Sequence, residues 1–146
     1  TPFGKNEYRR STVGLKYDSA TLAKDSVPTE TVNGVNGGTS VEKILQSGEV
    51  LAKITSGPDQ GKVGPFSLDS TGVTDGRATL DNIVGVNDTF APWQLLRRDI
   101  EVGVCYAGTL VQTKVTVRDE DGKRVPLDDA TAAALVAKKS LNITFR

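Results

Sequence analysis

The residue types that usually carry enzymatic chemistry are scarce in this sequence. It contains no histidine, which is the commonest general base and zinc ligand in proteins and a member of most catalytic triads. Its single cysteine, Cys105, excludes an internal disulfide and a zinc site built from thiolates. Because Cys105 lies in an alternating apolar stretch, we expect a buried and inert thiol. Asp128 and Asp129 are adjacent carboxylates, but adjacent residues at a helix start point in different directions, and helix capping explains them. We therefore expect no enzymatic activity, no cofactor and no metal.

Two segments resemble ligand-binding loops without meeting their requirements. Three residues separate Gly57 from Gly61, where a phosphate-binding loop needs four, and a valine follows Lys62 in place of the hydroxyl residue that holds magnesium. The run Asp119-Glu120-Asp121-Gly122 begins like a calcium loop but lacks a glutamate at the required distance. Both segments are interpreted as turns.

The elements that position these residues are expected to be short strands. A chain of 146 residues suits one domain, which at this size buries about 70% of its unfolded surface. Fifteen glycines and six prolines favour many turns. We predict strands over residues 49–55 and 83–86, and a hairpin over residues 100–117 that turns at Ala107-Gly108.

The end of the chain is predicted to hold one helix and a closing strand. Asp128 can cap a helix that runs to Lys139, with acidic residues at its positive end and lysines at its negative end. Its small alanine face is expected to pack on a sheet (Ala130, Ala133, Ala134 and Ala137). Residues 141–145 read as a strand. The predicted fold class is mainly β (a β-rich α+β fold), a small barrel-like or sandwich-like domain with one late helix.

Residues 1–40 differ from the rest and are predicted to form an extended arm that ends in a Gly/Asn linker, so that the β-rich domain spans residues 41–146. The arm has few large aliphatic residues, and its first 24 residues hold five basic and two acidic side chains. Several of its residues are candidate contacts with a partner protein. Phe3, Tyr8 and Tyr17 are expected anchors, and Val13, Leu15 and Tyr17 alternate as an added strand would. Arg9 and Arg10 suit pairing with a partner's carboxylates.

Residues 90–98 are the second candidate contact region. The mostly apolar run around Trp93 and Leu95 lies in a turn region, and Trp93 could fill the core or a subunit interface. Arg97, beside it, could pair with carboxylates across such an interface. Trp93, Leu95 and Arg97 are therefore the predicted interface residues.

The balance of charge argues against two classes of partner. Eighteen basic residues match eighteen acidic ones, so no overall field attracts nucleic acid or an anionic membrane. No apolar run approaches the roughly 20 residues that a membrane span requires. The first residues do not resemble a signal peptide, so synthesis in the cytoplasm is expected.

Residues 48–86 resemble the head-decoration family of tailed bacteriophages, the group that includes the lambda decoration protein. The resemblance rests on the strand Gly48–Thr55, the Gly/Pro turns after it, the step Thr74-Asp75-Gly76 and the short strand Ile83–Val86. The later strand pair, helix and closing strand follow in the family's order, so the resemblance covers about residues 41–146.

The resemblance implies a structural virion protein on the outer surface of an expanded capsid. It implies a homotrimer at local three-fold axes whose amino-terminal arm reaches the major capsid protein. The alternatives are another phage structural subunit, for head completion or the tail tube, and a module that binds carbohydrate or a host surface. A glycosidase with two carboxylates is the least supported, because no pair has a reason to converge.

Overall fold

The chain folds around a small, partly open β-barrel. The computed structural model describes residues 7–11, 14–33, 37–91 and 94–145. The strands of the main sheet are β1 (Lys16–Leu22), β4 (Val50–Lys53), β5 (Val63–Pro65), β6 (Ile83–Asn87), β7 (Ile100–Leu110) and β10 (Asn142–Phe145). They follow the order β1-β5-β4-β6-β7-β10, and β1 also pairs with β7, which closes the first five strands into a ring. The mainly β fold with one late helix is confirmed.

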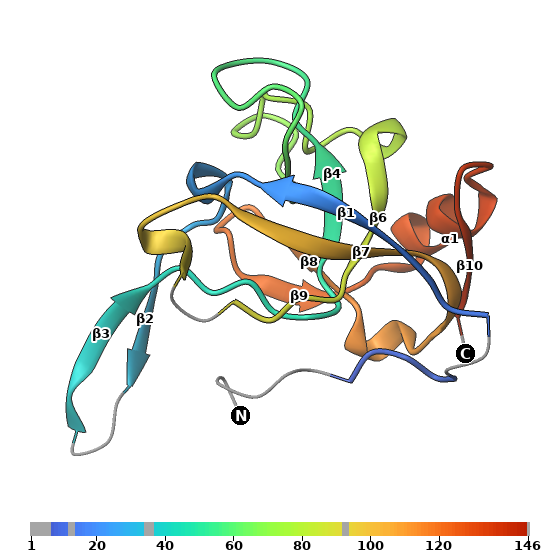
Figure 1. Cartoon of the computed structure of the whole chain (residues 1–146), viewed down its shortest axis with the longest axis horizontal. Helices are drawn as coiled ribbons and strands as arrows, with labels where there is room; N and C mark the ends of the chain where they lie inside the picture. Colours follow the sequence, from blue (N-terminus) through green and yellow to red (C-terminus); the bar gives the residue numbers. More distant parts are fainter. Residues whose placement is uncertain (1–6, 12–13, 34–36, 92–93, 146) are drawn as a thin grey trace.

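Two hairpins and one helix complete the fold. β2 (Glu30–Asn33) pairs with β3 (Thr39–Glu42), and β8 (Thr116–Arg118) pairs with β9 (Arg124–Pro126). The helix α1 (Asp129–Ala137) lies beside β10 (Figure 1). Short 3-10 turns occupy Lys24–Ser26, Leu80–Asn82, Gln94–Leu96 and Gln112–Lys114.

The barrel wall separates two apolar clusters. Inside the barrel, Leu22, Leu51 and Val102 belong to one cluster. On the other side of the wall, Val50 and Cys105 belong to a second cluster that α1, β8 and β10 help to cover. Neighbouring residues of a strand point to opposite faces, and Val50, Leu51 and Ala52 are all buried, so both faces of β4 are buried. Cys105 is buried as expected.

The predicted hairpin at residues 100–117 is wrong. β7 runs straight through Ala107-Gly108 to Leu110, and β8 pairs with β9 instead. A Cβ atom on Gly108 would lie 2.5 Å from Leu15 Cδ2, and Gly108 has φ of +146°. The glycine therefore allows the Leu15 side chain to pack against the strand and does not mark a turn.

The predicted helix is confirmed in position, but its buried face differs. Asp128 caps it by accepting a hydrogen bond from the Thr131 amide at 3.1 Å. Thr131, Ala132 and Leu135 are buried, whereas the expected alanine face is largely exposed.

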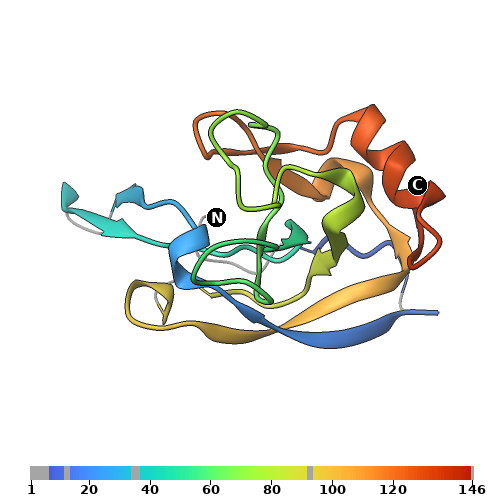
Figure 2. The same ribbon diagram turned by 90° about the horizontal axis from the view of Figure 1, so that it is seen from above.

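The arm predicted over residues 1–40 is wrong in its extent. β1 pairs with β7 along its whole length, from Lys16 opposite Ala107 to Leu22 opposite Ile100 (Figure 2). The alternation read as a strand for a partner's sheet therefore includes a strand of the chain's own barrel. The Gly/Asn stretch predicted as a linker lies between β2 and β3, which project from one end of the molecule while α1 and β10 lie at the other (Figure 1).

Candidate binding surfaces

Residues 7–11 lie against β7 and extend its pairing. The amide of Val111 donates to the Tyr8 carbonyl at 2.8 Å, and the Arg10 amide donates to the Thr109 carbonyl at 3.0 Å. Between these bonds, Arg9 forms a bridge with Leu110. We call residues 7–11 the strap.

Tyr8 is the core residue of the strap. Its side chain is 0% exposed, and its hydroxyl donates to Asp88 Oδ1 at 2.9 Å. Burial, followed by this hydrogen bond, raises the pKa of Tyr8. Tyr8 as an anchor on a partner protein is therefore wrong, because its side chain is already enclosed by its own domain.

Arg9 and Tyr17 meet on the outer side of the strap. Arg9 Nε and Nη2 donate to the two carboxylate oxygens of Glu7 at 2.9 and 3.0 Å, and Nη1 donates to the Tyr17 hydroxyl at 3.3 Å. The hydrogen bond to Glu7, then the one to Tyr17, raises the pKa of Arg9. Tyr17 remains 41% exposed. We call Glu7, Arg9 and Tyr17 the strap cluster.

The other predicted arm residues have different fates. Arg10 is exposed on the same segment as the strap cluster. Leu15 is partly buried and packs against the core. Phe3 and Val13 lie outside the described residues.

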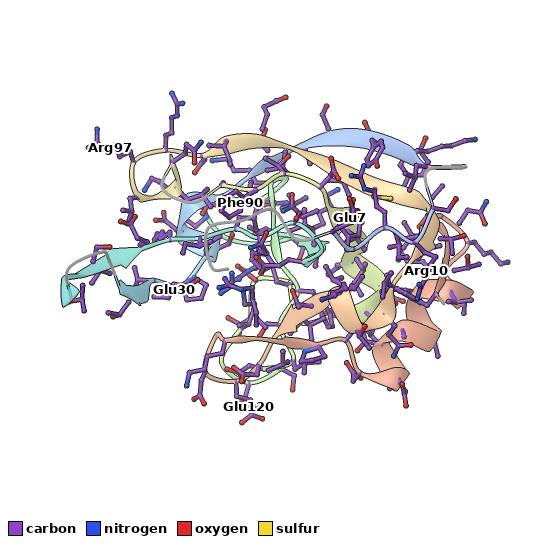
Figure 3. The ribbon with its side chains drawn as sticks, turned by 90° about the horizontal axis from the view of Figure 1, so that it is seen from below. Glu7, Arg10, Glu30, Phe90, Arg97 and Glu120 are labelled. Atoms are coloured by element: carbon purple, nitrogen blue, oxygen red, sulfur yellow. The ribbon has the colours of Figure 1, made fainter. Side chains whose placement is uncertain are left out.

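The predicted subunit interface does not form one surface. Leu95 is 0% exposed and belongs to the cluster inside the barrel, so its assignment to an interface is wrong. Trp93 lies outside the described residues. Arg97 is exposed, and Figure 3 shows that it lies at the opposite end of the molecule from Arg10. This stretch is apolar because one of its residues, Leu95, packs in the core.

The β2–β3 hairpin is a surface that the sequence reasoning missed, and we call it the ribbon. Its register pairs Glu30 with Glu42 and Thr31 with Val41. Val41 is 59% exposed, and Thr39 and Ser40 are exposed as well. The available signal was two short runs containing β-branched residues on either side of an Asn/Gly segment, which also fits a hairpin.

Charged hydrogen bonds fix the base of the ribbon to the domain. Arg124 donates from Nη1 and Nη2 to the Glu30 carboxylate at 2.7 and 2.9 Å. Arg118 Nε donates to Glu49 Oε1 at 2.7 Å, and both side chains are almost fully buried. The Ile44 carbonyl accepts from Arg118 at 3.0 Å and from Arg124 at 3.3 Å, which joins the two ion pairs.

The barrel opens into a hollow of about 560 Å³, which we call the barrel hollow. It lies where β1 separates from β4 to β6, close to the end of α1. Ala20, Val63, Val84 and Val104 contribute its apolar walls, and charged residues contribute the rest (Asp18, Lys53, Asp81 and Lys138). Lys138 Nζ donates to the Asp81 carbonyl at 2.6 Å.

The two loops that resemble ligand-binding motifs are held by ion pairs and hydrogen bonds within the domain. Lys62 Nζ lies 2.5 Å from Asp99 Oδ2 and 3.2 Å from Asp59 Oδ1, so acidic side chains surround this ammonium group. Asp119 Oδ1 accepts from the amides of Asp121 and Lys123 at 2.9 Å each, which closes a turn. Both observations agree with the interpretation as turns.

No group of three potential metal-ligating side chains occurs within the described ranges. Burial raises the pKa of the Cys105 thiol, which disfavours the reactive thiolate. Among the residues that the structure describes, no helix has the length and apolar character to cross a membrane. Comparison with protein-family models, curated proteins and solved structures finds no match.

Proposed function

We propose that this chain is a structural virion protein that binds the outside of an expanded phage capsid as a trimer and cements neighbouring major capsid subunits. The strap cluster carries the proposal. The residues expected to contact the capsid, Arg9 and Tyr17, are joined by a hydrogen bond, and each lies on a segment that pairs with β7. A preordered contact surface loses less conformational entropy on binding than a free arm.

A protein that cements a shell needs surfaces that contact neighbouring subunits, and it needs no catalytic activity. A protein that binds only the assembled shell stabilises that shell by mass action. Three strap clusters on one trimer also raise the effective concentration of each contact, so weak single contacts sum to firm retention.

The test uses expanded, undecorated heads of the phage that encodes the chain. Heads are mixed with the full chain, sedimented, and assayed for bound copies and thermal breakdown. Saturation in multiples of three and breakdown at a higher temperature are expected. Arg9→Ala with Tyr17→Ala should weaken binding about tenfold or more, since each loses a contact at the interface.

Lys123→Ala provides the matched control, because Lys123 is exposed on the β8–β9 turn, and Glu120 of that turn lies apart from Glu7 of the strap (Figure 3). Its binding should equal that of the wild-type chain. Unchanged retention of the Arg9/Tyr17 variant on heads would contradict the role of the strap cluster, and no binding by the wild-type chain would contradict the capsid proposal.

One observation favours a second candidate, a tail-tube or head-completion subunit. The ribbon projects from the barrel, and tail-tube subunits use long hairpins to form rings. Hexameric rings of the free chain, detected by mass analysis, would favour this alternative over a trimer. For the carbohydrate-binding alternative, Phe66 is buried, Phe90 and Tyr106 are only partly exposed, and Trp93 lies outside the described residues.

A further inference from the structure

β1 has one paired edge and one open edge. Its pairing with β7 covers residues 16–22, whereas its pairing with β5 is limited to Leu22 opposite Val63. The Ser19 amide donates to its neighbour's carboxylate, Asp18 Oδ1, at 2.8 Å. Ser19 stands opposite Gly103 of β7, whose carbonyl accepts from the Asp88 amide and whose amide donates to Thr89, so the Ser19 amide points away from β7. A strand edge of this kind can accept another strand.

The barrel hollow lies along this open edge. Asp18, Ser19 and Ala20 line it from β1, Val104 lines it from the paired strand β7, and Val84 lines it from β6. An added strand would have a row of backbone partners on one side and an apolar space for its inward side chains.

The ribbon has the complementary features. Within the described ranges, β2 and β3 pair only with each other, so their outer edges are open. Val41 places an apolar side chain, 59% exposed, on the middle of β3.

Each surface also carries one charge that no ion pair neutralises within the described ranges. Residues 29–42, which contain the ribbon, include two glutamates and no basic residue. Glu30 pairs with Arg124, whereas Glu42 forms no ion pair with any described residue. The lining of the hollow is balanced in charge, with Lys53 and Lys138 against Asp18 and Asp81, and Lys138 Nζ donates to the Asp81 carbonyl. Lys53 forms no ion pair with any residue in the described part of the chain.

The two surfaces lie apart on one molecule. The ribbon leaves the barrel at one end, while α1, whose end borders the hollow, lies at the other (Figures 1 and 2). A ribbon therefore cannot reach its own hollow, but it can reach that of another copy.

We propose that β3 of one copy adds to the open edge of β1 in a second copy, with Val41 entering the barrel hollow. The contact joins two different surfaces, so copies associate head to tail and close into a ring when the rotation permits. The inference rests on the self-association part of the proposed function and specifies the surfaces that join the copies.

The test measures the mass of the full chain by sedimentation velocity in the absence of heads. Ser19→Pro removes the open-edge amide without removing a bond to β7, and edge strands tolerate proline. Val41→Lys places a charge at the apolar contact. Each variant alone should associate at least about tenfold more weakly than the wild-type chain.

Mixing the two variants gives the decisive result. Ser19→Pro retains a working ribbon and Val41→Lys retains a working hollow, so the mixture should form dimers with one copy of each. Ser70→Pro, at an exposed turn, and Val136→Lys, on the exposed side of α1, are the matched controls and should assemble like the wild-type chain. Circular dichroism of every variant confirms that it is folded.

A wild-type chain that stays monomeric, or folded variants that assemble normally, would overturn the inference. A mixture that behaves like the separate variants would also overturn it, because a symmetric contact cannot be rescued in this way. These outcomes are independent of head binding, so failure of the inference and failure of the capsid proposal are distinguishable.

Discussion

Glu49→Gln is expected to be among the most destabilising single substitutions on the polar side of this fold. Glu49 is 0% exposed and Arg118 is 4% exposed, and their side chains form a hydrogen-bonded ion pair at 2.7 Å. The second Glu49 oxygen, Oε2, accepts the Gln46 amide at 2.7 Å. The substitution keeps the shape of the side chain but leaves the Arg118 guanidinium buried without an opposite charge.

The expected loss follows from that burial. Removing one partner of a buried ion pair costs about 3–5 kcal/mol of unfolding free energy. At roughly 3 °C per kcal/mol for a domain of this size, the melting temperature should fall by about 9–15 °C. Such a loss is a large fraction of the roughly 5–15 kcal/mol that stabilises a typical domain.

The measurement is chemical denaturation followed by circular dichroism, with a double-mutant cycle. Arg118→Met should be similarly costly, and the double variant should lose less than the sum of the two single losses because the charges are removed together. Glu30→Gln is the matched control. It breaks the Arg124 pair, whose side chains are 22% and 32% exposed, and should cost only about 1 kcal/mol. Equal losses for Glu49→Gln and Glu30→Gln would refute the argument from burial.

Three further results are expected. Tyr8→Phe should lower the free energy of unfolding by about 1 kcal/mol near neutral pH, because the hydrogen bond to Asp88 is lost. The folded pKa of Tyr8 is raised above 10.0, so the stability of the wild-type chain should fall as the pH rises beyond 10. Alkaline denaturation curves of the variant should lack this fall. Hydrogen bonds from the Lys24 amide and then from Lys62 lower the folded pKa of Asp99 below 3.8. The stability that this carboxylate contributes is present above that pH and should be lost as the pH falls through the folded pKa. Asp99→Asn should reduce this loss of stability in acid denaturation curves. Gly85→Ala should be more costly than Gly57→Ala, because its Cβ atom would lie 2.5 Å from the Cys105 carbonyl oxygen while Gly57 has open space around it, so equal melting temperatures would contradict the packing at Gly85.

The elements with strong local signals were predictable from the sequence. Asp128 caps α1 as expected because its side chain needs only a nearby amide. The short strand at residues 83–86 corresponds to β6, and the closing strand at residues 141–145 corresponds to β10. The turn at Asp121-Gly122 joins β8 to β9, where Gly122 has φ of +76°.

The failures share one cause, which is a contact between residues distant in the sequence. Gly108 was interpreted as a turn residue, but a glycine is needed there because the Leu15 side chain, more than 90 residues earlier in the sequence, packs against it. Residues 16–22 looked like an arm because β7, the strand that covers them, lies about 80 residues later. Tyr8 looked like an exposed anchor because its partner is Asp88. Composition within residues 1–40 carries no information about such partners.

The closure of the barrel also has a consequence for the order of folding. β1 is made early, but its long pairing is with β7, and a single bridge to β5 joins it to the intervening strands. During synthesis, β1 must therefore remain unpaired along most of its length until residues 100–110 have left the ribosome. Pairings of such high sequence separation slow folding, because a long loop must close before its contacts form. We expect the β4–β6 sheet to form first and β1, with the strap, to close the barrel last.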